Sequence, residues 1–309
     1  MTGVPHISVV VLSRDRGDEL LDTLARLCAL PERPPIIVVD NGSRDGSPAR
    51  VAERFPAVRL IALAGNEGAA ARTLGVRAAR TEYVAFSDDD SWWQPGALHA
   101  AVETFDAHSS VGLIAGRVLV GADERLEPTC AAMAASPLEP RPGLPGPRVL
   151  GFVACGAIIR RAAYLEAGGF HPRFGVGGEE ALLAADLAAA GWDLVYVDGL
   201  VSHHHPSPSR DRGARRRTTL RNDLWSVWLR RPWPAALRRT GQLIVSARAD
   251  AAARRGVADA MAGARWVAAE RDVLPAAVER DLRRLESSPP DRSPVAWRGA
   301  VLGRGVSRA

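Results

Sequence analysis

The sequence EYVAFSDDDSWW, residues 82–93, decides the expected fold. A short apolar run ends at Ser87, and three consecutive aspartates follow it, Asp88, Asp89 and Asp90. Such a run, bounded by turn residues, is typical of a strand that is buried on both faces. Three adjacent carboxylates repel one another, and a bound cation offsets that cost. The segment therefore predicts a buried strand that ends in a group of acidic side chains.

The same alternation of apolar strand and helix precedes this segment. Expected strands cover residues 7–12, 36–39 and 58–63, and expected helices cover residues 18–30, 48–54 and 69–79. Continuous apolar strands that alternate with helices predict an α/β fold, with a parallel sheet covered on both faces. In such sheets, ligands bind beyond the carboxyl ends of the strands.

Each expected strand ends in polar residues. These are residues 13–15 (SRD), 40–41 (DN), 66–68 (NEG) and 88–90 (DDD). One polar end is ordinary loop chemistry, but four at the same edge predict a binding site. In an extended segment Asp88 and Asp90 point the same way and Asp89 faces elsewhere. Carboxylate oxygens suit Mg²⁺ or Mn²⁺. The alternative is an acidic turn that caps a helix beginning near Pro95.

The second half of the chain is less regular. We expect a helix at residues 95–106, a strand at 112–120, regular structure at 153–160 and 162–167, a helix at 179–190 and a strand at 194–197. Residues 121–149 contain six prolines and predict a long loop or lid. From Thr218 onward the chain is expected to be helical, and its last twenty residues to be frayed.

Charge divides the chain into two parts. All 40 basic residues are arginine; residues 1–209 hold 18 of them against 25 acids, whereas residues 210–309 hold 22 against 10. The basic part is either a solvated helical face or a surface for an anionic partner, such as lipid headgroups or a polyphosphate. Trp225, Trp228 and Trp233 lie among its arginines, which suits an anionic membrane interface. No nucleic-acid-binding motif is visible, so we do not expect a nucleic-acid partner.

The cysteines and the hydropathy pattern predict a location. Three dispersed cysteines suit neither a disulfide framework nor a zinc site, and they fit a reducing cytoplasm. No signal peptide and no run of about 18 apolar residues is evident. The protein is therefore expected in the cytoplasm, either free or peripheral at the inner membrane face.

From residue 7 to about residue 228 the sequence resembles family 2 glycosyltransferases, which are inverting enzymes of the GT-A fold. The resemblance rests on ordered blocks: VVVLSRDR, VVDNGSRDGS, NEGAAARTLGVRAA, YVAFSDDDSWW, a GGF turn, EEALLAADLAAAGWDLVYV, and three histidines followed by RN. It implies a Rossmann-like nucleotide-binding mixed sheet flanked by helices, here with a C-terminal helical extension. The implied division is a catalytic domain at 1–209 (a nucleotide-sugar half at 1–110 and an acceptor half at 111–209), an extension at 210–290 and a flexible tail at 291–309.

The resemblance also implies roles for the donor-site residues. Asp40 would contact the uracil or thymine and the ribose, and residues Ser13, Arg14 and Asp15 would line the same pocket. Asn66 and Gly68 belong to an N-x-G block, in which a close backbone approach to the nucleotide favours glycine. Asp88 and Asp90 match the DxD motif, which holds the diphosphate through Mn²⁺ or Mg²⁺.

Further roles follow from the later blocks. Glu180 matches the catalytic base, one methylene longer than the usual aspartate, beside Glu179; the alternative for this pair is helix capping. Among His203, His204 and His205 the resemblance implies one metal ligand, and His203 continues the strand most directly. Arg221 resembles an arginine with a diphosphate or acceptor role.

The expected function is metal-dependent, inverting transfer of a sugar from a UDP- or dTDP-sugar to a hydroxyl of a saccharide, lipid-linked or small-molecule acceptor. A nucleotidyltransferase would need a glycine-rich loop after the first strand, where Ser13, Arg14 and Asp15 stand. A non-catalytic nucleotide-sugar-binding protein on the same scaffold is the other alternative. A dinucleotide-dependent oxidoreductase is disfavoured because no G-x-G-x-x-G follows that strand.

Overall fold

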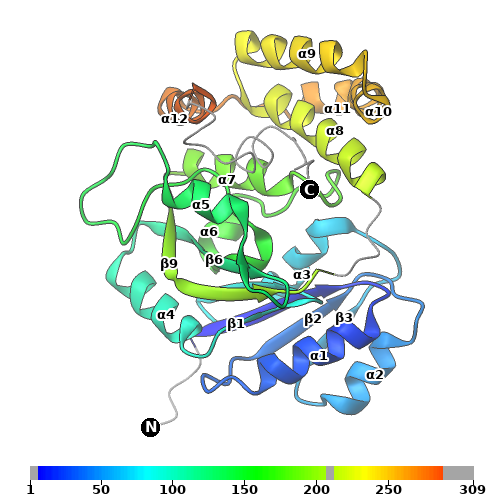
Figure 1. Ribbon diagram of the computed structural model, residues 1–309, viewed down its shortest axis with the longest axis vertical. Helices are drawn as coiled ribbons and strands as arrows, with labels where there is room; N and C mark the ends of the chain where they lie inside the picture. Colours follow the sequence, from blue (N-terminus) through cyan, green and yellow to red (C-terminus); the bar gives the residue numbers. More distant parts are fainter. Residues whose placement is uncertain (1–5, 207–211, 288–309) are drawn as a thin grey trace.

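The computed structural model describes residues 6–206 and 212–287, and it has a strand-rich part below a layer of C-terminal helices (Figure 1). The strands are β1 (Ile7–Ser13), β2 (Ile36–Asp40), β3 (Arg59–Ala62), β4 (Tyr83–Asp88), β5 (Ser91–Trp93), β6 (Val111–Val120), β7 (Arg125–Leu126), β8 (Ala157–Arg160) and β9 (Asp193–His204). The first helices are α1 (Gly17–Cys28), α2 (Ser47–Arg54), α3 (Arg72–Ala78), α4 (Ala97–Ala107), α5 (Pro128–Ala134), α6 (Arg161–Glu166) and α7 (Glu179–Ala189). The C-terminal helices are α8 (Arg212–Arg230), α9 (Trp233–Ala247), α10 (Ala251–Ala262), α11 (Ala264–Ala269) and α12 (Ala276–Ser287). The predicted tail at 291–309 lies outside the described residues.

One mixed sheet organises the strand-rich part. Its strand order is β3-β2-β1-β4-β8-β6-β9-β5, with β7 paired to β6. Strands β3, β2, β1 and β4 are parallel, as the alternating pattern predicts. β8 is antiparallel to both β4 and β6, so the sheet is parallel in the first half, where the alternating pattern predicts it, and mixed beyond. The mixed sheet that the resemblance implies is confirmed.

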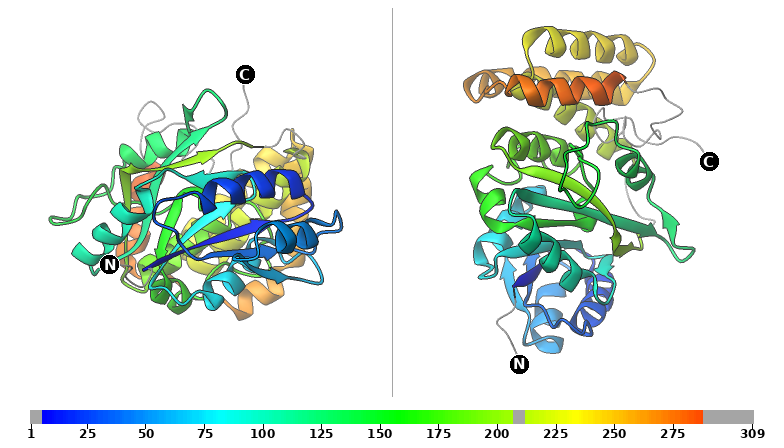
Figure 2. Two further views of the ribbon diagram at one scale, coloured as in Figure 1. Left: turned by 90° about the horizontal axis from the view of Figure 1, so that it is seen from below. Right: turned by 90° about the vertical axis from the view of Figure 1, so that its left-hand side faces the viewer.

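Buried apolar side chains attach the helices to the sheet. Leu20, Leu24 and Leu27 of α1 are all buried, as their spacing along one helical face predicts. On α3, Gly75 lets the helix approach the sheet closely, because a Cβ at this position would lie 2.5 Å from Val10 Cγ1. Figure 2 shows that helices flank the sheet on both sides.

The segment 121–149 is more ordered than the sequence indicates. It contains β7 and helix α5 instead of an uninterrupted loop. Glu127 caps this helix, since its side chain accepts a hydrogen bond from Thr129 N at 2.5 Å, and Pro128 occupies the first turn. We missed α5 because prolines are usually loop residues, although proline also favours the first helical turn.

Other boundaries also differ from the expectation. β9 extends to His204 rather than ending at residue 197, because it pairs with β6 along its length and its last residues also pair with β5. β5 was not expected at all; it is only three residues long and depends on β9 for its pairing. Helix α8 begins at Arg212 rather than near Thr218. These elements are defined by long-range pairing and packing, which local periodicity does not report.

The C-terminal helices pack against one another and onto the strand-rich part. Four apolar residues after α11, Leu274, Val278, Leu282 and Leu285, join the same buried core as β4 and β6. Inside the helical layer, Trp225 Nε1 donates to Ala260 O at 3.1 Å and Trp228 Nε1 to Thr240 Oγ1 at 2.9 Å. None of the helices among residues 6–206 and 212–287 combines the length and apolarity needed to cross a bilayer.

We expect Gly75→Ala to lower the free energy of unfolding by about 1–3 kcal/mol, the usual cost of overpacking a core. The added Cβ would meet Val10 Cγ1 at 2.5 Å and Val39 Cγ2 at 3.1 Å. Urea denaturation followed by circular dichroism measures the change. Gly241→Ala is the matched control: no atom lies within 4 Å of its added Cβ, so helix propensity alone should leave that variant equally or more stable. Equal destabilisation of both variants would contradict the packing argument.

Candidate functional site

The carboxyl ends of three parallel strands bring polar residues to one edge of the sheet. Ser13 of β1 pairs with Asp40 of β2, and Leu12 of β1 pairs with Asp88 of β4. Neighbouring parallel strands run in the same direction, so the residues that end them lie side by side. The prediction that these polar strand ends share an edge is therefore confirmed.

Several buried polar atoms at or next to this edge have no hydrogen-bond partner among the described residues. They include Ser13 Oγ, Asp40 Oδ1, Ser87 Oγ and Arg72 Nε. The other carboxylate oxygen of Asp40 accepts a hydrogen bond from Ser43 N at 3.0 Å. An unpaired buried polar atom costs about 1–3 kcal/mol. A group of such atoms on the ligand-binding edge indicates a site that a polar ligand completes.

Asp15 joins the turn after β1 to the turn after β2. Its backbone has a φ of 51°, its amide donates to Ser43 Oγ at 2.9 Å, and its Oδ1 accepts from Arg44 N at 2.6 Å. Arg14 is exposed, and its Nε lies 3.4 Å from Asp15 Oδ2. The side chain of Asp15 is therefore engaged in holding the two turns together, and residues 13–15 form one wall of the edge.

Asn66 and Gly68 hold a neighbouring loop in place. Asn66 Oδ1 accepts hydrogen bonds from Gly68 N at 2.9 Å and Asn41 Nδ2 at 3.0 Å. Gly68 has a φ of +63°, and a Cβ here would lie 2.5 Å from Gly175 Cα. Ala69 N also donates to Gly175 O at 3.0 Å. The close approach that requires glycine is therefore to the loop before α7, whereas the sequence suggests an approach to a nucleotide.

The three aspartates are held by two arginines. Asp88 ends β4 and is hydrogen-bonded to Arg72, whose side chain is 6% exposed. Arg16 Nη1 lies 3.1 Å from both Asp89 Oδ1 and Asp90 Oδ2. Asp89 and Asp90 occupy a turn rather than an extended segment, so the predicted separation of Asp89 from Asp90 does not hold. Burial raises the pKa of Asp89 to about 7, against the opposing effect of Arg16.

Strand β9 brings His204, and not His203, to the aspartates. His204 Nε2 lies 3.3 Å from Asp90 Oδ1. His203 stacks on Trp92 with ring centroids 5.6 Å apart, and its Nδ1 lies 3.0 Å from Glu124 Oε1. Successive residues of a strand point to opposite faces, so the two rings cannot share one site.

One group of ligand atoms at this edge has the donor set of a divalent-metal site. A carboxylate oxygen of Asp88, Sγ of Cys155 and a ring nitrogen of His204 lie within 4.8 Å of one another. Carboxylate oxygens and imidazole suit Mn²⁺, and Asp90 lies next to the same imidazole. The residues present therefore fit the divalent ion that the DxD resemblance implies, although burial raises the pKa of the Cys155 thiol.

The two glutamates at the start of α7 have different surroundings. Glu179 is 3% exposed and accepts a hydrogen bond from Gly177 N, so its carboxylate closes the loop before its own helix. Burial, followed by the charge of Glu180, raises the pKa of Glu179 to about 8. Glu180 is half-buried, and burial raises its pKa as well, while Arg215 and Arg72 oppose the shift.

Arg221 and Asn222 of α8 hold the glycine-rich loop that precedes these glutamates. Asn222 is fully buried, and its Nδ2 donates to Phe174 O at 2.8 Å and Gly177 O at 2.7 Å. Arg221 Nη2 donates to Phe174 O at 2.7 Å, and its guanidinium lies 4.3 Å from the ring centre of Trp225. The structure thus gives Arg221 a loop-positioning contact where the resemblance suggests a diphosphate or acceptor contact.

Sequence reasoning missed two arginines and one cysteine of this site. Arg72 and Arg16 contact the aspartates, and Cys155 reaches them from the short 3₁₀ helix at Ala154–Gly156. Arg72 has a signal in the sequence, because it is the one charged residue in the run AAARTLGV at residues 69–76. The structure buries it. Cys155 has none, since buried cysteine is common in protein cores.

The tryptophans beside the aspartates are accounted for by packing. Trp93 is fully buried, and its Nε1 donates to Phe86 O at 3.1 Å. Trp92 stacks on the ring of His203, and the guanidinium of Arg26 lies 4.1 Å from the centre of its ring.

Comparisons with known proteins agree with this architecture. The rhamnosyltransferase of Mycobacterium tuberculosis that acts as an N-acetylglucosaminyl-diphospho-decaprenol L-rhamnosyltransferase is 28% identical over 240 residues. That match covers 67% of this chain and 78% of the mycobacterial protein.

Solved structures share the fold at low sequence identity. The crystal structure of GalNAc-T7 with UDP, GalNAc and Mn²⁺ matches with a TM-score of 0.58 and 16% identity; the match covers 74% of this chain and about half, 48%, of that one. The mannosyltransferase PcManGT from Pyrobaculum calidifontis, in complex with GDP-Man and Mn²⁺, matches with a TM-score of 0.54 and 19% identity, over 98% of this chain and 81% of that one. These matches show the GT-A fold.

The family itself is identified by sequence. Residues 8–168, about half of the chain, match the family model described as glycosyl transferase family 2. This region contains strands β1 to β4, the three aspartates and Arg72. The chain therefore belongs to glycosyl transferase family 2, and its activity is glycosyl transfer.

Proposed function

We propose that the protein transfers a hexosyl or deoxyhexosyl group from a UDP- or dTDP-sugar to an acceptor hydroxyl, with inversion at the anomeric carbon and with bound Mn²⁺ or Mg²⁺. One observation carries the proposal. Ligand atoms of Asp88 and His204 converge at the sheet edge where buried polar atoms of Ser13 and Asp40 have no partner within residues 6–206 and 212–287. A nucleotide supplies the missing hydrogen bonds, and a metal-bound diphosphate fits the adjacent acidic group.

In this proposal the donor base and ribose lie against Asp40 and residues 13–15. Asp40 is only 2% exposed, and one of its oxygens is fixed by Ser43 N, so its free oxygen has a defined direction. Asn66 and Gly68 shape the same wall through the loop that they hold. A buried polar group such as the Asp40 carboxylate gives specificity for the base, because a ligand that does not bond to it would leave it unpaired.

Asp88, Asp90 and His204 would hold the divalent ion. The proposed histidine ligand is therefore His204, and not its neighbour His203. When bound, the ion offsets the negative charge that builds on the leaving diphosphate. Arg72 and Arg16 orient the carboxylates and reduce their mutual repulsion. Neither arginine is replaceable by a neutral residue without leaving buried carboxylates uncompensated.

Glu180 is the proposed general base. Its carboxylate is half-buried at the N-terminus of α7 and close enough to Asp88 for the two charges to interact. It would take the proton of the acceptor hydroxyl as that oxygen attacks the anomeric carbon. Glu179 would act indirectly, because its carboxylate is already bonded to Gly177 N and holds the loop.

For the acceptor we propose a lipid-linked saccharide, by analogy with the mycobacterial relative, whose name specifies a decaprenol diphosphate substrate.

We also propose a catalytic domain at residues 1–209 and a helical extension at 210–290. A cytoplasmic location is consistent with Cys28, Cys130 and Cys155, none of which forms a disulfide.

The proposed metal site predicts a difference between two neighbouring histidines. His204→Ala should weaken Mn²⁺-dependent binding of UDP by about tenfold or more, and Asp88→Asn or Asp90→Asn should abolish it. His203→Ala is the matched control and should bind normally, because its ring faces Trp92 and Glu124. Isothermal titration calorimetry with and without Mn²⁺ measures the effect. Loss of binding in His203→Ala with retention in His204→Ala would reverse the assignment.

The proposed base predicts a difference between two neighbouring glutamates. Glu180→Gln should keep UDP binding within a few-fold and lower kcat by about 10²–10⁴. Glu179→Gln should lower kcat less and should lower Tm more, because its carboxylate closes the buried loop at Gly177. Steady-state kinetics and thermal unfolding of both variants test this. If Glu179→Gln is inactive at unchanged Tm while Glu180→Gln turns over, the base is Glu179.

The pKa of Glu180 predicts the acid side of the pH profile. Burial raises this pKa above the ordinary glutamate value of 4.5, and the base acts only when deprotonated. Activity should therefore be full at alkaline pH and should fall as pH drops through a pKa above 4.5. We expect kcat/KM to follow this limb in the native enzyme and in Glu179→Gln, measured from pH 5 to 9. A limb at an ordinary glutamate pKa would contradict the buried setting of Glu180.

A further inference from the structure

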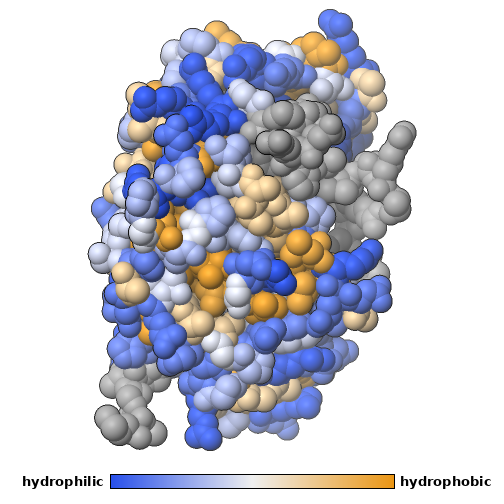
Figure 3. Space-filling view, turned by 60° about the vertical axis from the view of Figure 1, so that its left-hand side comes forward, coloured by the Kyte–Doolittle hydropathy of each residue, from blue (hydrophilic) through white to orange (hydrophobic). Residues whose placement is uncertain are grey.

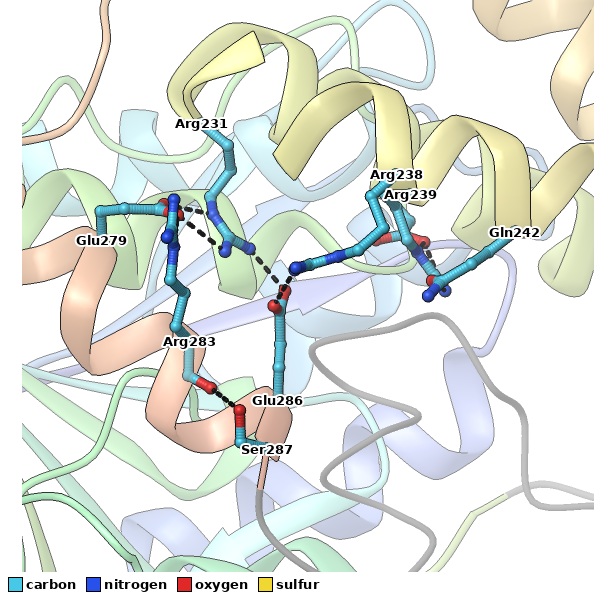
Figure 4. Close-up of polar contacts among 9 residues, drawn as sticks. Arg231, Arg238, Arg239, Gln242, Glu279, Arg283, Glu286 and Ser287 are labelled. Atoms are coloured by element: carbon cyan, nitrogen blue, oxygen red, sulfur yellow. Dashed lines mark hydrogen bonds and ion pairs between the residues drawn. The ribbon is translucent and has the colours of Figure 1, made fainter. Parts of the chain in front are cut away.

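The arginines of helix α9 pair with acids of neighbouring helices. Arg239 is buried, and its Nε donates to Asp223 Oδ2 of α8 at 2.7 Å. Arg238 Nη2 lies 2.6 Å from Glu286 Oε2 of α12, which also pairs with Arg231 at 2.6 Å. In Figure 4, Arg238 of α9 reaches toward α12 and meets Glu286, which Arg231 also contacts. Ion pairs therefore attach α9 to the helices beneath it.

The exposed side of α9 carries four large apolar side chains, beside the exposed Arg238 and Gln242. Trp233 is 58% exposed, Leu237 66%, Ile244 50% and Val245 61%. Spacings of four and seven residues place Trp233, Leu237 and Ile244 on one stripe of a helix, and Val245 borders it. Toward the core, α9 buries Ala235, Ala236, Leu243 and Ala247, so it has apolar residues on its exposed side as well as on its buried side. A helix on the surface of a water-soluble domain usually has apolar residues only toward the core.

This apolar stripe lies at one end of the molecule. In Figures 1 and 2, α9 forms the outermost layer, on the far side of α8 from the sheet. Figure 3 shows hydrophobic side chains at this upper end, next to hydrophilic ones. Large apolar side chains exposed together on one helix mark a place where a protein meets another apolar phase or partner.

The charges around the stripe select the kind of partner. Residues 233–249, which include all of α9, contain three arginines and no acid. Arg248 and Arg255 are exposed next to the helix, and the nearby Asp250 lies 2.6 Å from Arg216. Arg271 covers one side of the Trp233 ring, 4.1 Å from its centre. An apolar stripe with a tryptophan and bordering arginines complements the headgroups and upper acyl chains of an anionic bilayer.

We propose that the outer face of α9, formed by Trp233, Leu237, Ile244 and Val245, binds the surface of an anionic lipid bilayer. The helix lies in the plane of the interface, with its apolar side chains among the upper acyl chains and its arginines at the phosphates. The purpose of this contact rests on the proposed function, since it holds the site near a lipid-linked acceptor. The contact itself is independent of catalysis.

The proposed membrane surface differs from the one that the sequence suggests. Trp225 and Trp228, expected at a membrane together with Trp233, are packed inside the helical layer against α10 and α9. Several arginines of α8 are engaged in ion pairs; Arg217, for example, lies 2.6 Å from Asp259. Of the three tryptophans, only Trp233 belongs to an exposed apolar stripe.

Cosedimentation with vesicles tests the proposal on the full chain. We expect binding to vesicles of equal parts phosphatidylglycerol and phosphatidylcholine, weakening as salt rises because the charge attraction is screened within about 10 Å at 0.1 M ionic strength. Pure phosphatidylcholine should bind far less. Leu237→Glu and Ile244→Glu should each lower partitioning by about tenfold or more. Leu126→Glu, at a 42% exposed leucine of β7, is the matched control and should bind like the native chain.

Three further measurements keep the outcomes distinct. Thermal unfolding should be unchanged in Leu237→Glu, because the substituted side chain is already exposed. Mn²⁺-dependent UDP binding should also be unchanged, so that failure of the donor-site proposal would appear there and not in the vesicle assay. Light scattering after gel filtration tests whether a second copy covers the face instead. Absence of vesicle binding at low salt, equal binding by Leu237→Glu, or a dimer that Leu237→Glu dissociates would each overturn the proposal.

Discussion

The rest of the site depends on the ion pairs between two arginines and the three aspartates at the end of β4. Asp88, Asp89 and Asp90 are adjacent; Asp89 and Asp90 are buried and Asp88 is partly buried, which is unfavourable for three negative charges. Arg72 from one side and Arg16 from the other supply the opposite charge. Arg72 comes from α3 and Arg16 from the turn before α1. The acidic edge can therefore form only when both of these segments are folded against β4.

A second set of contacts connects the edge to the C-terminal helices. Gly68 touches Gly175 on one side of the glycine-rich loop, and Asn222 of α8 holds the same loop from the other side. Glu179 and Glu180 begin α7 directly after that loop. The helical layer therefore positions the proposed base, and it is more than an appendage to the catalytic part. Its own stability depends on buried ion pairs such as Arg231 with Glu279.

The structure of the helical layer divides the arginines of the C-terminal part into two groups. Some arginines satisfy buried acids, as Arg239 does with Asp223, and these contribute to folding. Others, such as Arg248, remain exposed beside an apolar stripe. Composition alone cannot separate the two groups of arginines, because both groups lie in the same arginine-rich helical part of the sequence. What distinguishes them is whether an acid from another helix lies within reach.

The sequence alone determined the elements whose signal is local. The apolar runs that end in Asp40 and Asp88 predicted the parallel half of the sheet and its polar edge, because strand burial and strand ends are visible in hydropathy. The ordered blocks identified the family, and the glutamate pair followed from their order. Tertiary structure decided which histidine faces the aspartates, since β9 extends to His204 by pairing with β6 on one side and β5 on the other, and this pairing sets which face His204 occupies. It also decided the partners of Arg72 and Cys155 and the outward direction of Trp233, because each depends on contacts between segments far apart in the chain, which no local pattern reports.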